Sequence, residues 1–149
     1  MAILRGAGTE IIRTCFIHEV DDTARYLIYG AQHHIYTILN ITCHAVAVNS
    51  AASWIECVFK GYDSGAGTSA ADIYLFRQIM AAKETFVWDN NLSFNGHEPT
   101  DFTGPIDSVV KQDAVADQGS AVAQYLVVGA LHGSDNIDVS CTYIDQNNA

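Results

Sequence analysis

The sequence predicts an all-β protein: a single-domain antiparallel β-sandwich of jelly-roll-like type, with about eight strands. Two observations lead to this fold class. Apolar and polar residues alternate with a period of two in several segments that are rich in β-branched and aromatic residues. Turn-forming residues separate these segments at short intervals, which is typical of sandwiches and jelly rolls. A chain of 149 residues also has the length of one domain.

The longest alternating run, residues 35–48, illustrates the pattern. Asn40, Thr42 and His44 fall on one face of an extended chain, and the other face carries the apolar residues Leu39, Ile41, Cys43, Ala45 and Ala47. A turn-like sequence at 49–52 separates this run from a second one at 53–59. We expect the two runs to form a long antiparallel hairpin across 35–62, with one face in a core.

Further strands are expected on both sides of this hairpin, at 10–19, Arg25–Tyr29, 72–80, 85–88, 92–94, 122–131 and 137–144. Residues 97–119 are polar, contain both prolines and are predicted to form the longest irregular segment. The chain is therefore divided into an N-terminal arm at 1–8, a β-sandwich domain at 9–145 and a flexible tail at 146–149.

The charge of the chain disfavours two classes of partner. The chain has seventeen acidic and seven basic residues, so its formal net charge is −10. Such a chain repels phosphate, whereas nucleic-acid binding depends on Lys and Arg that displace counterions. We therefore expect no nucleic-acid partner and no binding to anionic membranes. The sequence also shows no apolar stretch of the kind found in secretory signals or transmembrane helices, so we expect a soluble protein in a reducing cytosol.

The four cysteines are predicted to be buried free thiols. They include no C-x-x-C pair, which disfavours a zinc ribbon. Cys43, Cys57 and Cys141 fall in the apolar register of their strands, where cysteine behaves as a small hydrophobic residue, and Cys15 is ambiguous. The alternative is a disulfide between Cys43 and Cys57, which could lie opposite each other across the expected hairpin.

No segment carries a convincing catalytic, cofactor-binding or metal-binding signature, so the sequence predicts a protein that is not an enzyme. The sequence Gly65-Ala66-Gly67 lacks the third glycine and the Lys-Ser/Thr ending of a phosphate loop. His33 and His34 would point to opposite faces of a strand. The other polar candidates suit turns, isolated surface positions or solvated strand faces better than a site: His44, Asp21, Asp22, Asp89, Asn90, Asn91, His97, Glu98, Glu10 and Glu19.

The order of segments across residues 35–144 resembles the small β-sandwich virion proteins of tailed bacteriophages. The pattern begins with a strand that opens at 35–40, an Asn-Ser turn at 49–50 and a second strand that contains Trp54. It continues with a strand that contains Tyr74-Leu75, the connector 83–85 and the segment 92–96, and it ends with a last strand that contains 139–143. The resemblance covers about three quarters of the chain. The polar segment 97–119 departs from the family pattern.

This resemblance implies a virion structural protein, assembled in the host cytoplasm, that decorates and stabilises the capsid exterior as a cement protein. Its expected partners are the major capsid protein and itself, as a homotrimer, with residues 1–8 and 97–119 ordering against a neighbouring subunit or the shell. The alternative is a tail, baseplate or fibre-associated binding protein, or a carbohydrate-binding sandwich. In that case Trp54, Trp88 and Tyr62 are candidates for stacking on sugar rings, although packing in the core or at an interface is the simpler interpretation of each.

Overall fold

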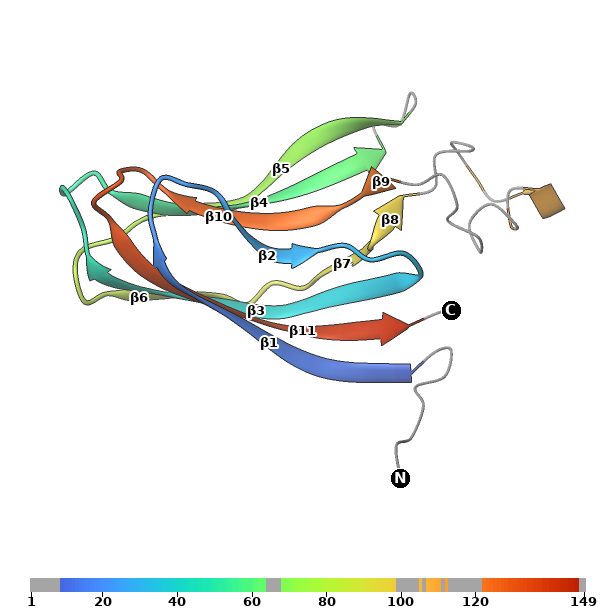
Figure 1. Cartoon of the computed structure of the whole chain (residues 1–149), viewed down its shortest axis with the longest axis horizontal. Coiled ribbons are helices and arrows are strands. Elements are labelled where there is room, and N and C mark those ends of the chain that lie inside the picture. The colour runs from blue at the N-terminus through green and yellow to red at the C-terminus, as the bar shows by residue number, and fades with distance from the viewer. Residues whose placement is uncertain are drawn as a thin grey trace.

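The computed structural model describes residues 9–63, 68–98, 105, 107–110, 112 and 122–147, and it consists of two β-sheets packed face to face (Figure 1). Sheet A contains β1 (Thr9–Val20), β11 (Asn136–Asn147), β3 (His34–Ala47), β6 (Thr85–Trp88) and β7 (Leu92–Asn95). Sheet B contains β2 (Arg25–Tyr29), β10 (Tyr125–Ala130), β4 (Trp54–Asp63) and β5 (Thr68–Ile79). A separate short pair joins β8 (His97–Glu98) to β9 (Val122–Ala123).

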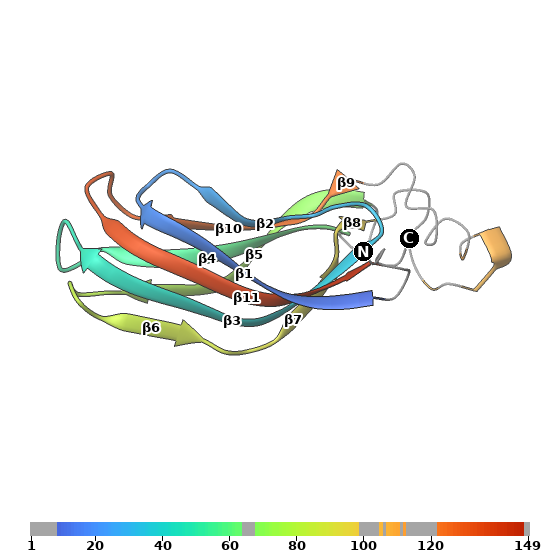
Figure 2. The same ribbon diagram turned by 60° about the horizontal axis from the view of Figure 1, so that its bottom comes forward.

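Four nested antiparallel pairings build the two sheets. β1 pairs with β11, β2 with β10, β3 with β6 and β7, and β4 with β5. Figure 2, in which the molecule is turned, shows β11 between β1 and β3. When β6 and β7 are counted as one interrupted strand, the eight main strands have the spatial orders 1-8-3-6 and 2-7-4-5. This is the order of a jelly roll, so the predicted antiparallel sandwich is confirmed.

The predicted hairpin across 35–62 is wrong. Its two halves are β3, in sheet A, and β4, in sheet B, and the turn between them crosses from one sheet to the other. Alternation shows which side chains face the core, but it does not show which strand lies alongside. The expected strand at 122–131 is likewise divided into β9 and β10, and the short pair β8–β9 was not expected at all.

The predicted boundary between domain and tail is also wrong at its C-terminal side. Gln146 and Asn147 continue β11, where Asn147 lies opposite Thr9 of β1 and His34 of β3. They therefore belong to sheet A rather than to a tail. Residues 148–149, the expected arm at 1–8 and most of the segment 97–119 lie outside the described residues.

The core lies between the sheets and is made of inward-facing residues from both. Its largest fully buried apolar side chains are Ile38, Ile41, Ile55, Met80, Leu126, Ile137, Val20, Val128 and Val139. Burying a side chain of this size contributes about 1.5–3 kcal/mol, so this layer is the main source of stability. No helix among the described residues is long and apolar enough to cross a membrane.

The cysteines belong to this core. Cys43, Cys57 and Cys141 are fully buried, Cys15 is half-buried, and all four are free thiols. Burial raises the pKa of Cys43 and of Cys141 to about 12. The thiolate is the reactive form, so these side chains act as inert hydrophobic residues. The main expectation is confirmed, and Cys43 and Cys57 lie in different sheets rather than opposite each other in one ladder.

Candidate binding face

The outer face of sheet B carries a group of tyrosines that we call the tyrosine cluster: Tyr26 and Tyr29 of β2 and Tyr125 of β10. A β-bulge at Leu27 turns both Leu27 and Ile28 into the core, which leaves Tyr26 and Tyr29 on the same outer face. The Tyr26 ring meets each of the other two edge to face at 5.2 Å between centroids, and Tyr29 stacks on Tyr125 at 5.6 Å. Tyr26 and Tyr29 are nevertheless 54% and 60% exposed.

A second group, the arginine cluster, lies across the same face and consists of Trp54 of β4 with Tyr74 and Arg77 of β5. The guanidinium carbon of Arg77 lies 4.2 Å from the centroid of the Trp54 ring and 6.0 Å from that of Tyr74. Two nitrogens of Arg77 also donate to Oε2 of Glu56, at 2.6 and 2.9 Å. This combination of cation–π contact and charge-assisted hydrogen bonds holds Arg77 in one position on the surface.

A shallow groove of about 310 Å³ separates the two clusters. One row of side chains crosses all four strands there, because Tyr26 lies opposite Val127, Val127 opposite Val58, and Val58 opposite Tyr74. Two small valines thus lie between two taller tyrosines. In the next row, the ammonium of Lys60 forms an ion pair with Asp72, and this hydrogen bond raises the pKa of Lys60. The groove therefore has an apolar base and charged groups beside it.

Much of the outer face of sheet A is different, because it carries small polar side chains. The hydroxyl oxygens of Thr14 and Thr142 lie 3.3 Å apart, and those of Thr37 and Ser93 lie 3.0 Å apart. His44, which was expected on a polar strand face, lies here with its Nδ1 2.8 Å from the Thr85 hydroxyl. These polar groups satisfy one another's hydrogen bonds. Large exposed apolar side chains of this face lie on its edge strands, Ile12 and Phe16 on β1 and Val87 on β6.

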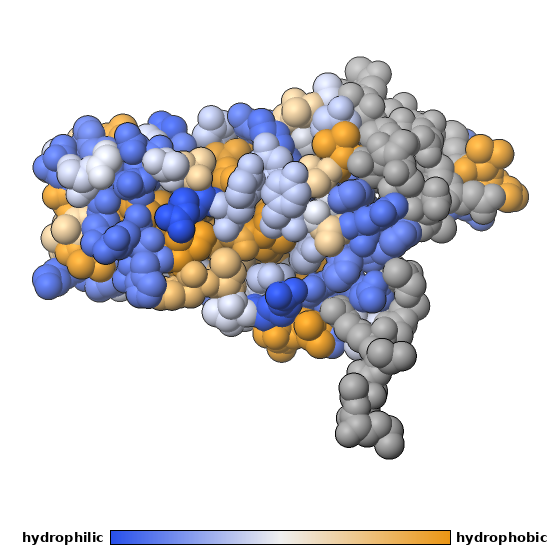
Figure 3. Space-filling model, in the orientation of Figure 1, coloured by the Kyte–Doolittle hydropathy of each residue, from blue (hydrophilic) through white to orange (hydrophobic). Residues whose placement is uncertain are grey.

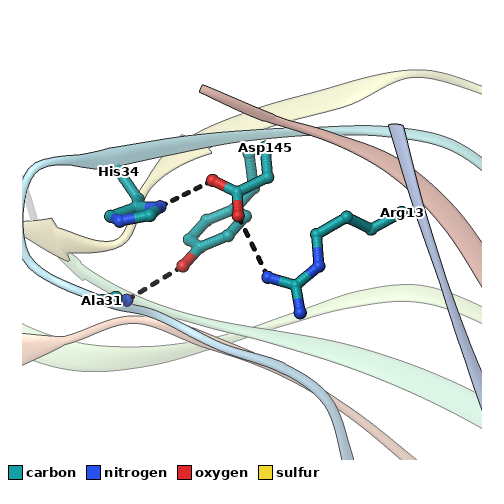
Figure 4. Close-up of polar contacts among 5 residues, drawn as sticks. Arg13, Ala31, His34 and Asp145 are labelled. Atoms are coloured by element: carbon teal, nitrogen blue, oxygen red, sulfur yellow. Dashed lines mark hydrogen bonds and ion pairs between the residues drawn. The ribbon is translucent and has the colours of Figure 1, made fainter. Parts of the chain in front are cut away.

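A buried carboxylate joins three strands of sheet A, as Figure 4 shows. Asp145 is 1% exposed, and its Oδ1 lies 2.6 Å from Nδ1 of His34, while its Oδ2 accepts a hydrogen bond from Arg13 at 3.2 Å. This hydrogen bond raises the pKa of Arg13. An Asp–His pair is part of a hydrolase triad. Here, however, the second carboxylate oxygen holds Arg13, and the cluster ties β1, β11 and β3 together.

The structure separates the three aromatic candidates. Trp54 lies on the outer face of sheet B within the arginine cluster. Trp88 packs between the sheets against Phe76, at 6.4 Å between ring centroids, so the packing interpretation holds for it. Tyr62 is half-buried, and its backbone NH donates to the Gln124 side chain.

The polar candidates do not come together into a site. His33 has a φ of 65° in the turn before β3. The pKa of His97 in β8 is lowered, mainly by burial and to a smaller extent by the nearby His33. Asp21 accepts a hydrogen bond from the Thr23 NH at 2.8 Å, as in a turn. Among the described residues, no group of three or more His, Cys, Asp or Glu could hold a metal ion. Gly65-Ala66-Gly67 lies outside the described residues.

Five residues of the candidate binding face were not predicted from the sequence: Tyr26, Tyr29, Tyr74, Arg77 and Tyr125. Tyr74 and Tyr125 lay within strands that were predicted, and alternation along β5 from the polar Asp72 could have suggested Tyr74. Tyr26 and Tyr29 are three residues apart, and strict alternation places such residues on opposite faces. Only the bulge at Leu27 brings them together.

Comparisons with known proteins add little to this geometry. The chain matches no protein-family model, and no curated protein is similar to it. Among solved structures, it is similar to a chain described with the words "Bacillus endospore appendages form a novel family of disulfide-linked pili". The two are 12% identical, with a TM-score of 0.42, over 100% of this chain and 97% of the other. At this TM-score the likeness carries no functional argument.

Proposed function

We propose that this protein is a structural component of a phage virion that decorates the capsid exterior and stabilises the shell by binding the major capsid protein. The observation that carries the proposal is the exposed aromatic face of sheet B. Trp, Tyr and Arg are the residues that contribute most often to binding energy at protein interfaces. Here they project from paired strands and are fixed by ring and guanidinium contacts, so little conformational entropy is lost when a partner binds.

Two further properties support this proposal. Jelly rolls occur in viral capsid and lectin domains, although a fold alone does not define a function. The formal net charge of −10 makes contact with packaged DNA unfavourable, which favours a position outside the shell. A protein that binds only the assembled shell would stabilise it by mass action, without any chemical step. The homotrimer that the resemblance implies stays a prediction.

The first test is the number of copies on purified particles and the effect of removing them. The copy number of a cement protein approaches the number of shell subunits. Particles stripped of it release their DNA at a lower temperature. Added wild-type protein restores the original release temperature. Equal heat resistance of stripped particles, or location of the protein on the tail, would contradict the proposal.

The second test asks whether the aromatic face makes the contact. A Tyr26→Ala/Tyr74→Ala double variant should bind stripped particles at least about tenfold more weakly, because truncation of interface hot spots costs about 2 kcal/mol or more. The matched control is Thr42→Ala/Thr142→Ala on the outer face of sheet A, which should bind like the wild type. Circular dichroism shows whether both variants retain the fold. Equal binding by both variants would exclude sheet B as the docking face.

The groove favours a second candidate, a tail, baseplate or fibre-associated binding protein. The CH-rich face of a sugar ring can stack on Tyr26 or Tyr74, while Lys60 and Asp72 lie within reach of its hydroxyl groups. Tail proteins are present in a few to dozens of copies, so the copy number on particles separates the two candidates. Chemical-shift changes of Tyr26 and Tyr74, but not of Thr42, on titration with neutral oligosaccharides would support the second one.

A further inference from the structure

β1 forms one edge of sheet A, and its side away from β11 pairs with no other described strand. Such an edge presents a row of unpaired backbone NH and C=O groups. Natural edges are usually shielded by Lys, Pro, bulges or short length. β1 is 12 residues long and contains neither Lys nor Pro. It pairs regularly with β11 from Thr9 to Ile17, and its one irregularity, between Ile17 and Val20, lies near the end of the strand. It is therefore an open template for another strand.

The side chains of this edge are also unusually apolar. Ile12 is 70% exposed and Phe16 is 52% exposed, and both alternate with Thr14 on the outer face of sheet A. Figure 3 shows hydrophobic atoms at the lower border of the molecule, near the place where Figure 1 draws β1. Exposed apolar side chains beside an open strand edge indicate an interaction surface.

The order of residues along β1 is nearly symmetric about Thr14. Glu10 and His18 lie four positions from it on either side, and Ile12 and Phe16 lie two positions from it. If two copies of β1 pair antiparallel with Thr14 opposite Thr14, Ile12 faces Phe16 of the second copy. Glu10 then faces His18 of the second copy, whose Nδ1 already lies 3.4 Å from Asp138.

The neighbouring registers are less favourable. To keep the outer faces of two copies on the same side of one sheet, the two-fold axis must pass beside a single residue. An axis beside Arg13 opposes two like charges directly, which destabilises a cross-strand pair. An axis beside Cys15 places His18 opposite Ile12 of the second copy. Only the axis beside Thr14 pairs apolar with apolar and acid with imidazole.

We propose that a second copy of this chain pairs antiparallel along β1, with the two-fold axis beside Thr14, so that the two copies of sheet A become one continuous sheet. The contact is isologous, with each copy supplying the same strand. It adds main-chain hydrogen bonds for affinity and side-chain pairs for register, as in other strand additions. The purified chain should pair in this way in solution, whether or not it belongs to a virion.

Light scattering of the purified protein measures the mass, and we expect a dimer. Ile12→Lys and Phe16→Lys should each weaken self-association at least tenfold, because a charge on each copy then opposes an apolar side chain. The control is Val87→Lys, a 52% exposed position on β6 at the opposite edge of sheet A, which should stay dimeric. A monomeric wild-type protein would contradict the proposal. So would the homotrimer that the resemblance implies, because an isologous two-fold contact cannot close a ring of three. Loss of shell binding by the variants of a monomeric protein would assign β1 to the shell instead.

Cross-linking tests the register. In a Cys15→Ser background, Thr14→Cys should form an intermolecular disulfide rapidly under mild oxidation, because directly opposed residues have the short Cβ separation that a disulfide needs. Ile12→Cys alone should cross-link much more slowly, since its counterpart lies four positions away along the ladder. Equal or faster cross-linking by Ile12→Cys would overturn the Thr14 axis.

Discussion

The two ends of the sandwich are closed in different ways. At one end the chain turns tightly between β1 and β2, β3 and β4, β5 and β6, and β10 and β11; we call it the short-turn end. The other end, the termini end, holds the start of β1 and the end of β11, and the short pair β8–β9 lies beside it (Figure 1). The short-turn end is held by a carboxylate, and the termini end by closely approaching backbones.

Asp135 organises the short-turn end. It is 4% exposed, and its carboxylate accepts hydrogen bonds from the Asn49 NH at 2.7 Å, the buried Ser53 hydroxyl at 2.8 Å and the His132 NH at 2.9 Å. One side chain thus links the turn between β3 and β4 to the turn between β10 and β11. Burial raises the pKa of Asp135, but these hydrogen bonds outweigh it, and the pKa lies below its ordinary value.

Three backbone segments meet at the termini end. The Gly30 NH donates to the Gln124 carbonyl and the Gln124 NH to the Gly96 carbonyl, each at 2.8 Å. The buried Gln124 side chain completes the junction, because its amide donates to the Asn95 carbonyl and accepts from the Tyr62 NH. A Cβ on Gly96 would lie only 2.0 Å from the Ala31 carbonyl oxygen. This end depends on steric fit, whereas the short-turn end depends on a charge.

Gly96→Ala should have the largest effect, because the added methyl group meets backbone atoms that cannot move without breaking the junction. We expect a loss of more than about 3 kcal/mol in the free energy of unfolding, within the range of severe steric mutations. The matched control is Gly129→Ala in β10, whose added Cβ would have its nearest neighbour at 3.9 Å. Urea denaturation measures both. Equal losses would show that steric fit does not distinguish the termini end.

Asp135→Asn should have an intermediate effect that depends on pH. Because the folded pKa lies below the ordinary value of 3.8, the carboxylate stabilises the fold above that value and loses this contribution as the pH falls through the lowered pKa. We expect a loss of about 1–3 kcal/mol at neutral pH. Thermal unfolding curves of the two proteins should converge on acidification. A difference in unfolding temperature between the two proteins that stays constant from pH 7 to pH 3 would contradict stabilisation of this end by the carboxylate charge.

Ser134→Ala should have the smallest effect. Its hydroxyl donates to the Asn49 side chain at 2.7 Å and links the same two turns as Asp135, but it is exposed. We expect a loss of about 0.5 kcal/mol or less, since exposed hydrogen bonds exchange readily with water. Thermal unfolding at neutral pH measures it. A loss as large as that of Asp135→Asn would mean that the exposed contacts between the turns stabilise this end as much as the carboxylate does.

The sequence by itself determined the all-β class, the approximate positions of most strands and the burial of most core residues. Alternation assigned Ile41, Cys43 and Ala45 to the core correctly, because one face of each strand must leave water. It failed at Leu39, where a bulge opposite β11 shifts the register and places Ile38 in the core instead. Local alternation cannot reveal a bulge, since the extra residue is set by the partner strand.

Only the tertiary structure decided which strands are neighbours and therefore where the candidate binding face lies. Arg13 and Asp145 are 132 positions apart in sequence and meet because β1 pairs with β11. Tyr26 meets Tyr125 for the same kind of reason, through the pairing of β2 with β10. Strand pairing depends on complementarity between distant segments and on their turns. A single strand carries the pattern of its own two faces, but it does not specify the strand beside it.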